Sequence, residues 1–443
     1  MLVVPMSSSP GLEISTLPQH QFFRGYRWRI LVLLFLITIV NIVDRQTLSV
    51  VAPLLTQTFH MSNSDYGRIV SAFMLGMMIG EFPMGWLMDR IGVRSGFSFA
   101  AVWWSIGTAM HSIGRSVFQF SLFRFWMGTG ECGNFSGGMK VVSEWFPEHE
   151  WALAVGIFNS GTMIGAVLAP PLIVFITLHF GWRTAFLLPA FLGVAWALLW
   201  RSYYRPLAAH PRVSSEERAY ILEQRAPSEH APKTRDLLSS RRVWAPMLCR
   251  LLVGPVMQFY WFWTPQYLFH ARGLTLAEIG LFSWIPFFFG DIGSIGGGWI
   301  AGLLIRRGFT VNTARLSTMY FGAVCCLLSI GVVTAATTAS AIGFISLVLF
   351  GNTFLSANMF AAISDLVPRA VVGRVTGMTG IAGGLSGLTF PLLTGWLIDH
   401  VSYVPAFFIA ALMPLAGVFL LHAVVGRIQA PPAPAMSEAQ LTL

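Results

Sequence analysis

An aspartate followed directly by an arginine, Asp44-Arg45, lies inside the long apolar run 28–50. Insertion scales put the cost of such a charge at a helix centre at about 2.5–3.5 kcal/mol, so intramembrane charges usually face a bundle interior or a water-filled cavity. A second charged pair, Arg124 and Glu131, lies in another apolar run. Two such pairs favour a functional cluster that handles protons or anions over a single structural ion pair.

Arg124 and Glu131 are seven residues apart, so in a helix they share one face, separated by roughly 10 Å of rise. Gly128 lies between them and lets a ligand or another helix come close. The directions of the two spans place Asp44 and Arg124 at similar depths, where they can pair, and this leaves Glu131 as the more isolated acid. A buried, isolated acid could bind and release protons near neutral pH. The alternative is a static network of salt bridges.

Charged residues are scarce along the whole chain. Of 443 residues, 55% are hydrophobic and 11% are charged, whereas a soluble chain carries about a quarter charged residues. The composition therefore indicates a polytopic membrane protein. A net charge of +9 could suggest nucleic-acid binding, but the basic residues lie in loops without a basic-aromatic patch. We expect them to contact membrane lipids and expect no nucleic-acid partner.

Twelve apolar runs are long enough to cross a membrane as helices of about 20 residues. They predict an all-α membrane protein with 12 transmembrane helices in two pseudo-symmetric six-helix bundles. The predicted parts are an N-terminal tail (1–27), the first bundle (28–203), a linker (204–242), the second bundle (243–426) and a C-terminal tail (427–443).

The basic residues of the loops lie mainly on one predicted side. Twenty-one Lys and Arg fall on the side of the two termini and four on the other. Because cytoplasmic loops carry the excess of basic residues, both termini are predicted to be cytoplasmic. We therefore expect a multi-pass protein of the bacterial cytoplasmic (inner) membrane. In the linker, Ser214 and Glu217 have the spacing of a capping box and predict a short surface helix.

The two predicted bundles also match each other in sequence. A shift of 221 residues places Glu144-Trp145-Phe146-Pro147 on Asp365-Leu366-Val367-Pro368, Gly156 on Gly377 and Pro170 on Pro391. Parallel six-helix repeats are typical of secondary transporters whose binding site lies near the membrane midplane, between the halves.

The loop between the second and third predicted spans reads Gly85-Trp86-Leu87-Met88-Asp89-Arg90-Ile91-Gly92-Val93-Arg94. An acid, basic residues and glycines in a short loop permit a tight turn and an ion-pair latch. The segment resembles the G-x-L-a-D-r-x-G-x-r signature of the major facilitator superfamily. We expect Gly85, Asp89, Arg90 and Arg94, with Glu144, to form a cytoplasmic gate. Simple solvation of the loop is the alternative.

The intramembrane charges, with the segment 143–150, resemble the anion:cation symporter family within that superfamily, and its hexuronate and galactonate types in particular. In galactonate-type relatives the acids of helices 1 and 4 are proton sites, and the arginine of helix 1 binds the substrate carboxylate. The resemblance implies proton coupling by Asp44 and Glu131. It also implies substrate binding by Arg45, with Arg124 as the helix-4 partner.

One departure from the galactonate type concerns hydroxyl recognition. Those relatives carry Gln on helix 5 and Asn on helix 11, where this chain has Thr162 and Gly380. Further candidates for hydroxyl binding are polar or aromatic residues inside predicted spans, although such side chains also simply fill bundles. They are Asn159 and Thr162 in helix 5, Gln258, Tyr260 and Trp261 in helix 7, and Asn352 and Asn358 in helix 10. Asp291 has no assigned role, and Arg250 can extend to the membrane interface.

Together these features predict a secondary active transporter that imports an organic anion, a hexuronate or another sugar acid, by proton symport with alternating access. Alternatives are symport of another carboxylate (an aldonate, aldarate, tartrate or aromatic acid) and drug:proton antiport, for which the Gly-Pro-x-x-Gly-Gly motif is missing from helix 5. A sensor or a membrane enzyme is a third, but no nucleophile–base set supports catalysis. We expect no cofactor and no metal. The expected partners are the small anion, protons and lipids, and the protein is expected to be a monomer.

Overall fold

Helices make up almost all of the part of the chain that the structure, a computed structural model, describes, namely residues 25–223, 237–368 and 371–429. The first half contains α1 (Tyr26–Phe59), α2 (Asn63–Met110), α3 (Val117–Trp145), α4 (Trp151–Phe180) and α5 (Trp182–Tyr203), followed by α6 (Ser215–Glu223) in the linker. The second half contains α8 (Arg241–His270), α9 (Leu276–Phe282), α10 (Trp284–Arg306), α11 (Val311–Cys326), α12 (Ser329–Thr334), α13 (Thr338–Leu366), α14 (Val372–His400) and α15 (Tyr403–Val425).

The local sequence explains where several of these helices begin. A Ser or Thr side chain accepts a hydrogen bond from the amide three residues later, which satisfies one of the free N–H groups of the first turn. This N-cap is provided by Ser62 for α2, Ser116 for α3, Thr275 for α9, Thr310 for α11 and Thr337 for α13.

The described helices account for the twelve predicted membrane crossings. Nine helical segments of the described chain are long and apolar enough to span a membrane, with α2 counted once. The helix α2 contains two crossings, because its backbone turns at Gly92 (φ 78°). Polar residues lower the hydropathy of α3 and α8, which have spanning lengths of 29 and 30 residues. The predicted all-α membrane protein is confirmed.

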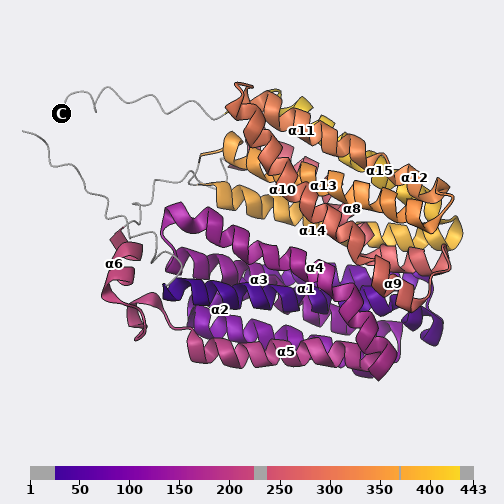
Figure 1. Cartoon of the computed structure of the whole chain (residues 1–443), viewed down its shortest axis with the longest axis horizontal. Helices are drawn as coiled ribbons and strands as arrows, with labels where there is room; N and C mark the ends of the chain where they lie inside the picture. Colours follow the sequence, from indigo (N-terminus) through magenta and orange to yellow (C-terminus); the bar gives the residue numbers. More distant parts are fainter. Residues whose placement is uncertain (1–24, 224–236, 369–370, 430–443) are drawn as a thin grey trace, which may run out of the picture.

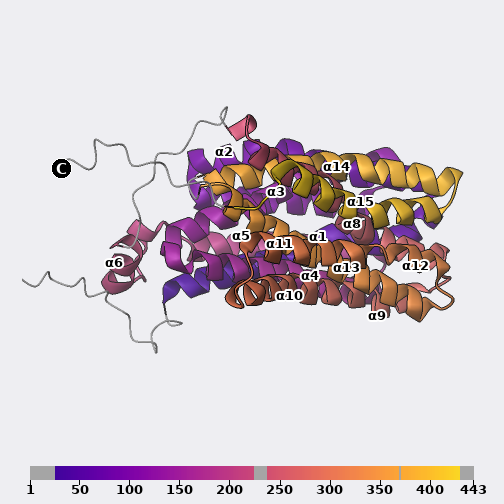
Figure 2. The ribbon, with the colours of Figure 1, turned by 90° about the horizontal axis from the view of Figure 1, so that it is seen from above.

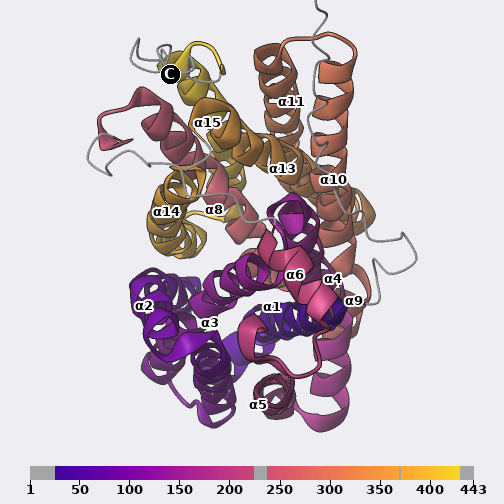
Figure 3. The same ribbon diagram turned by 90° about the vertical axis from the view of Figure 1, so that its left-hand side faces the viewer.

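The helices form two groups that lie side by side in Figure 1, and Figure 2 looks down on them with the second half in front. Helices α1–α5 form one half, and helices α8–α15 form the other. We call the end of the bundle near α6, where α5 and α13 finish, the linker end. We call the opposite end, where α1, α4 and α14 finish, the far end. Figure 3 looks at the molecule from the linker end, with α8 and α14 facing the first half.

Hydrogen bonds join the two halves at the far end. The Ser49 hydroxyl of α1 donates to the Trp261 carbonyl at 2.7 Å, and the Tyr66 hydroxyl of α2 donates to the Phe262 carbonyl at 2.8 Å. Both carbonyls belong to α8. These bonds fix α1 and α2 against the second half.

A second far-end contact joins α14 to the start of α2. The Asp399 carboxylate accepts hydrogen bonds from the backbone N–H groups of Asn63 (3.0 Å) and Ser64 (2.7 Å) and from the Asn63 amide (2.9 Å). A carboxylate of one half therefore caps a helix of the other half. We call this contact the far-end latch.

The same face of α14 shows that the halves separate toward the linker end. Added at Gly395, a Cβ atom would lie 2.5 Å from the Asn63 carbonyl oxygen, and at Gly384 its nearest neighbour would be Met78, at 3.8 Å. Nothing would lie within 4 Å of a Cβ atom at Gly377, two turns further along. The bundle is closed at the far end and open along this seam at the linker end.

The linker helix α6 packs on the first half through a buried ionic cluster. The Arg27 side chain, 1% exposed, contacts Glu150 at 3.1 Å and Glu217 of α6 at 3.3 Å. The Glu217 carboxylate also accepts the backbone N–H of Tyr26 at 2.9 Å, which caps α1. The linker thus contains a short helix, α6, and this helix is fixed to α1.

Candidate functional site

The centre of the candidate site is an ion pair between α1 and α3. Both Nε and Nη2 of Arg45 donate to the same oxygen, Oε2 of Glu131, at 3.0 and 2.9 Å. The Glu131 side chain is fully buried, whereas 17% of the Arg45 side chain is exposed. The guanidinium lies 6.0 Å from the Trp261 ring of α8, so it sits where the two halves meet.

The Arg124 side chain is buried beside this pair without contacting a carboxylate. Its Nη2 donates to the backbone carbonyl of Arg45 at 2.8 Å, and its Nη1 contacts the Met127 sulfur at 3.3 Å. The guanidinium groups of Arg45 and Arg124 lie 5.3 and 5.2 Å from the Phe73 ring. No sequence signal distinguished Phe73 from the other aromatic residues of the spans.

Asp44, the neighbour of Arg45 on α1, is completely buried. Among the described residues neither of its carboxylate oxygens has a well-formed hydrogen bond, and the side chains of Trp104 and Thr108 of α2 lie next to it. The predicted pairing of Asp44 with Arg124 is therefore wrong, and Glu131 is not isolated. The reason is that consecutive side chains of a helix point about 100° apart, so Arg45 faces α3 while Asp44 faces α2.

The other predicted binding residues fall into two groups. Trp261 and Gln258 of α8 are partly exposed, and Trp261 faces Arg45. Asn159 and Thr162 are partly exposed on α4. Their roles in binding stay predictions.

Three further candidates use their polar atoms inside the second half. The Tyr260 hydroxyl bonds to Ser329 at 2.7 Å, and Nδ2 of Asn352 donates to the Val253 carbonyl at 3.2 Å. The Asn358 amide donates to the Gly297 carbonyl and accepts from Arg315. The structure does not bring these three side chains to the Arg45–Glu131 pair.

The predicted gate residues form contacts within the first half. Asp89 pairs with Lys140 of α3, and Arg94 donates to the Arg201 carbonyl of α5 at 3.0 Å. The Arg90 guanidinium lies 5.2 Å from the Trp86 ring. Gly85 lies in open space, because a Cβ atom added there would have no neighbour within 4 Å.

Glu144 holds the start of the linker. It accepts a hydrogen bond from the Tyr204 hydroxyl at 2.5 Å and one from the Leu207 amide at 3.0 Å. Burial, and then the neighbouring Glu144 carboxylate, raise the pKa of Tyr204 above its ordinary value. Tyr204 therefore stays a hydrogen-bond donor at all physiological pH values.

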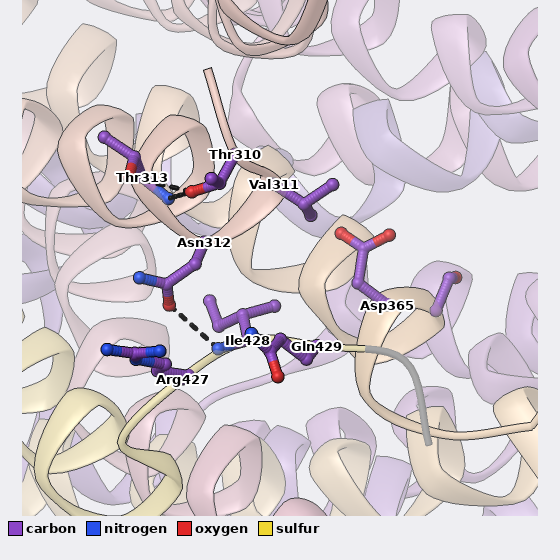
Figure 4. Close-up of a pocket in the computed structure, with 9 residues that line it drawn as sticks. Thr310, Val311, Asn312, Thr313, Asp365, Arg427, Ile428 and Gln429 are labelled. Carbon is purple, nitrogen blue, oxygen red and sulfur yellow. Dashed lines mark hydrogen bonds between the residues drawn. The ribbon is translucent and has the colours of Figure 1, made fainter. Parts of the chain in front are cut away.

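The second half carries its own ion pair at the linker end. Arg315 of α11 contacts Asp365, the repeat counterpart of Glu144, at 2.9 Å. A cavity of about 620 Å³ lies beside Asp365, between the start of α11 and the residues that follow α15 (Figure 4). Across it, the Ile428 amide donates to Asn312 at 2.8 Å.

The comparison with protein families decides the class of the protein. The family described as Major Facilitator Superfamily matches residues 34–391, which include parts of both halves. The chain belongs to the Major Facilitator Superfamily. It is a multi-pass membrane transporter and not an enzyme, and the predicted fold with two six-helix bundles is confirmed.

Curated relatives in this superfamily resemble the chain over most of its length. The hexuronate transporter of Escherichia coli (strain K12) is 29% identical over 411 residues, which cover 91% of this chain and 94% of that protein. The D-galactonate transporter of Escherichia coli O6:H1 is 28% identical over 415 residues, with coverage of 91% and 96%.

Solved structures support the fold. A bacterial homolog of the human lysosomal transporter Spinster, in an inward-facing and occupied conformation, superimposes with a TM-score of 0.75 at 15% identity, covering 92% of this chain and 99% of that chain. A D-xylose-proton symporter superimposes with a TM-score of 0.69 at 18% identity, covering 89% and 97%.

Proposed function

We propose that the protein imports a sugar acid, of the hexuronate class or a close relative, together with protons. The observation that carries this proposal is the Arg45–Glu131 pair, in which a buried carboxylate binds a guanidinium at the boundary between the halves. The relatives named above carry the names of hexuronate and galactonate transporters, and both substrates are carboxylates.

Competition for one guanidinium provides the coupling. While Glu131 is ionised, it holds two N–H groups of Arg45. Protonation of Glu131 releases these donors, and a substrate carboxylate can then bind them in a bidentate manner. A buried charge that loses its partner costs about 3–5 kcal/mol, so proton and anion are expected to bind together rather than singly.

Asp44 and Arg124 complete the proposed site. A buried carboxyl without an ion-pair partner is costly to keep charged, and we assign Asp44 as the second proton-coupling residue. Arg124 binds the backbone of Arg45, and we propose that it fixes the position of the substrate-binding arginine and adds positive charge for the incoming anion.

In alternating access, the linker end would close and the far end would open. With the termini in the cytoplasm of a bacterial cell, as the basic residues predict, the described state opens inward. The bundles 28–203 and 243–426 would rock about the central site as a monomer. Opening outward requires the far-end latch and the Ser49 and Tyr66 bonds to break, while the linker-end residues around Asp89 and Glu144 approach the second half.

Purified protein in vesicles tests the function directly. Each member of a panel of hexuronates, aldonates, aldarates and aromatic acids is added to the external medium while the external pH is recorded. Symport predicts that a transported acid makes the external medium more alkaline. Acidification instead would favour the antiport alternative, and no transport of any acid in the panel would reject the proposal.

Replacing Glu131 by Gln tests the coupling. We expect Glu131→Gln to lose accumulation driven by a pH gradient, because its side chain cannot be ionised, while exchange of substrate across the membrane continues. Glu216→Gln, which changes an exposed acid of α6, is the control and should behave like the unmodified protein. Full pH-driven accumulation by Glu131→Gln would contradict the assigned role.

A further inference from the structure

Besides Arg45 and Arg124, a third arginine, Arg250, lies inside the bundle, and among the described residues it has no counter-ion. Arg250 is the tenth residue of α8, and among the described residues no carboxylate or hydrogen-bond acceptor binds its guanidinium. Its Cζ lies 5.3 Å from the Phe360 ring of α13. Charged residues inside membrane bundles usually mark ion or substrate pathways, and Arg250 has no role in the proposed binding of proton and anion at Arg45 and Glu131.

Glycines make room for the Arg250 side chain. A Cβ atom added at Gly383 of α14 would lie 3.0 Å from Nε of Arg250, and one at Gly254 would lie 3.6 Å from the same atom. The guanidinium therefore lies along α14 and over α13, held by apolar surfaces and glycine backbone. Such an environment fixes its position but does not neutralise its charge.

The direction of the side chain follows from helix geometry. Arg250 and Trp261 are eleven residues apart on α8, which is three turns plus about 20°. They therefore share one face, and Trp261 on that face lies 6.0 Å from the Arg45 guanidinium. The rise between them is about 16 Å, directed toward the linker end. Arg250 is partly exposed, and Phe360 is 39% exposed, so a ligand can reach both side chains.

We propose that Arg250 is a second carboxylate-binding site, which receives the anion on its way to the linker end after Arg45 has returned to Glu131. This inference rests on the proposed function. In the described state Glu131 occupies Arg45, so an anion that leaves the central site needs another cation. Arg250 lies on the same face of α8, unpaired and toward the open seam.

We expect Arg250 to affect capture of the anion from the linker end but not from the far end. Loss of a charge-assisted hydrogen bond at Arg250 should weaken capture of the anion from the linker end by about tenfold. Capture from the far end depends on Arg45 and should not change. A purely structural role of Arg250 would instead change both directions together.

The test compares influx and efflux in vesicles with defined protein orientation, using D-galacturonate as the probe. Arg250→Gln should raise KM about tenfold for transport that starts at the linker end, and change KM by less than about twofold from the far end. Arg250→Lys keeps the charge and should recover part of the loss. Arg241→Gln is the matched control, because nine residues place Arg241 on the opposite face of the same helix.

A second pair of variants keeps the arginine in place. Gly254→Asp brings a carboxylate near Nε of Arg250 and should reproduce the rise in KM, whereas Gly254→Ala should not, because its Cβ makes only an ordinary contact of 3.6 Å. Unchanged linker-end KM values in both Arg250→Gln and Gly254→Asp would overturn this inference and leave the proposed function standing. Failure of the unmodified protein to move any sugar acid would instead reject the proposed function.

Discussion

Removal of the Asp399 carboxylate should shift the balance between the two conformations. In the described state this carboxylate accepts three hydrogen bonds at 2.7–3.0 Å from the start of α2. The residue is exposed, so the contact resembles a helix N-cap, and loss of a cap costs about 1 kcal/mol. The latch exists only while the far end is closed, so Asp399→Ala should favour the far-end-open state about fivefold.

A single cysteine reports on that balance. Thr56 is buried beside a cavity of about 280 Å³ where α1 and α2 meet α8 and α15 at the far end. A polar thiol reagent should reach Thr56→Cys only when the halves separate there. With Asp399→Ala in the same chain, we expect labelling from the far side to become about fivefold faster. The chain without Thr56→Cys corrects for the native cysteines.

Asp65→Ala provides the matched control. Asp65 accepts hydrogen bonds from the backbone and hydroxyl of Ser62, so it caps the same helix from within its own half. Its loss should lower thermal stability without changing the labelling rate. Equal labelling rates for Asp399→Ala and its parent, with the fold intact, would refute the idea that the latch stabilises the closed far end.

Two further predictions concern arginines that form ion pairs. Arg45→Lys should lose most of the thermal shift that a sugar acid induces, because an ammonium group cannot reproduce the bidentate geometry of a guanidinium; a full shift in thermal-unfolding assays would contradict this. Arg27→Met should destabilise the first half by about 3–5 kcal/mol, because it leaves Glu150 buried without its counter-ion. Arg29→Met, a neighbouring exposed arginine, should leave the unfolding temperature unchanged.

The number of membrane crossings could be predicted from the sequence because the thickness of the membrane fixes the length of an apolar run. The turn near Gly92 could also be predicted, because a short loop with an acid and basic residues separates two apolar runs there. The loop's positive φ of 78° requires a glycine. The family followed from the same loop, whose pattern is specific at this position in the chain.

The partner of each buried charge could not be predicted in the same way. Spacing along one helix shows which residues share a face, but not which neighbour that face meets. Here the close packing of α2 on α3 decides the matter: a Cβ atom at Gly128 would lie 2.4 Å from the Phe73 carbonyl. With α3 packed in this way, Glu131 contacts Arg45. Depth alone suggested a pair of Asp44 with Arg124, but Arg124 instead donates to the backbone carbonyl of Arg45.

The charges of the central cluster balance one another. The cluster contains two acids and two arginines, and only Arg45 and Glu131 form an ion pair through their side chains. If one proton replaces the arginine at Glu131 and one carboxylate replaces Glu131 at Arg45, the net charge of the pair is zero both before and after the exchange. At this pair, the proposed loaded state and the described state then carry the same net charge. A carrier built this way can change conformation in both states, whereas a proton or an anion alone leaves a net charge buried between the halves.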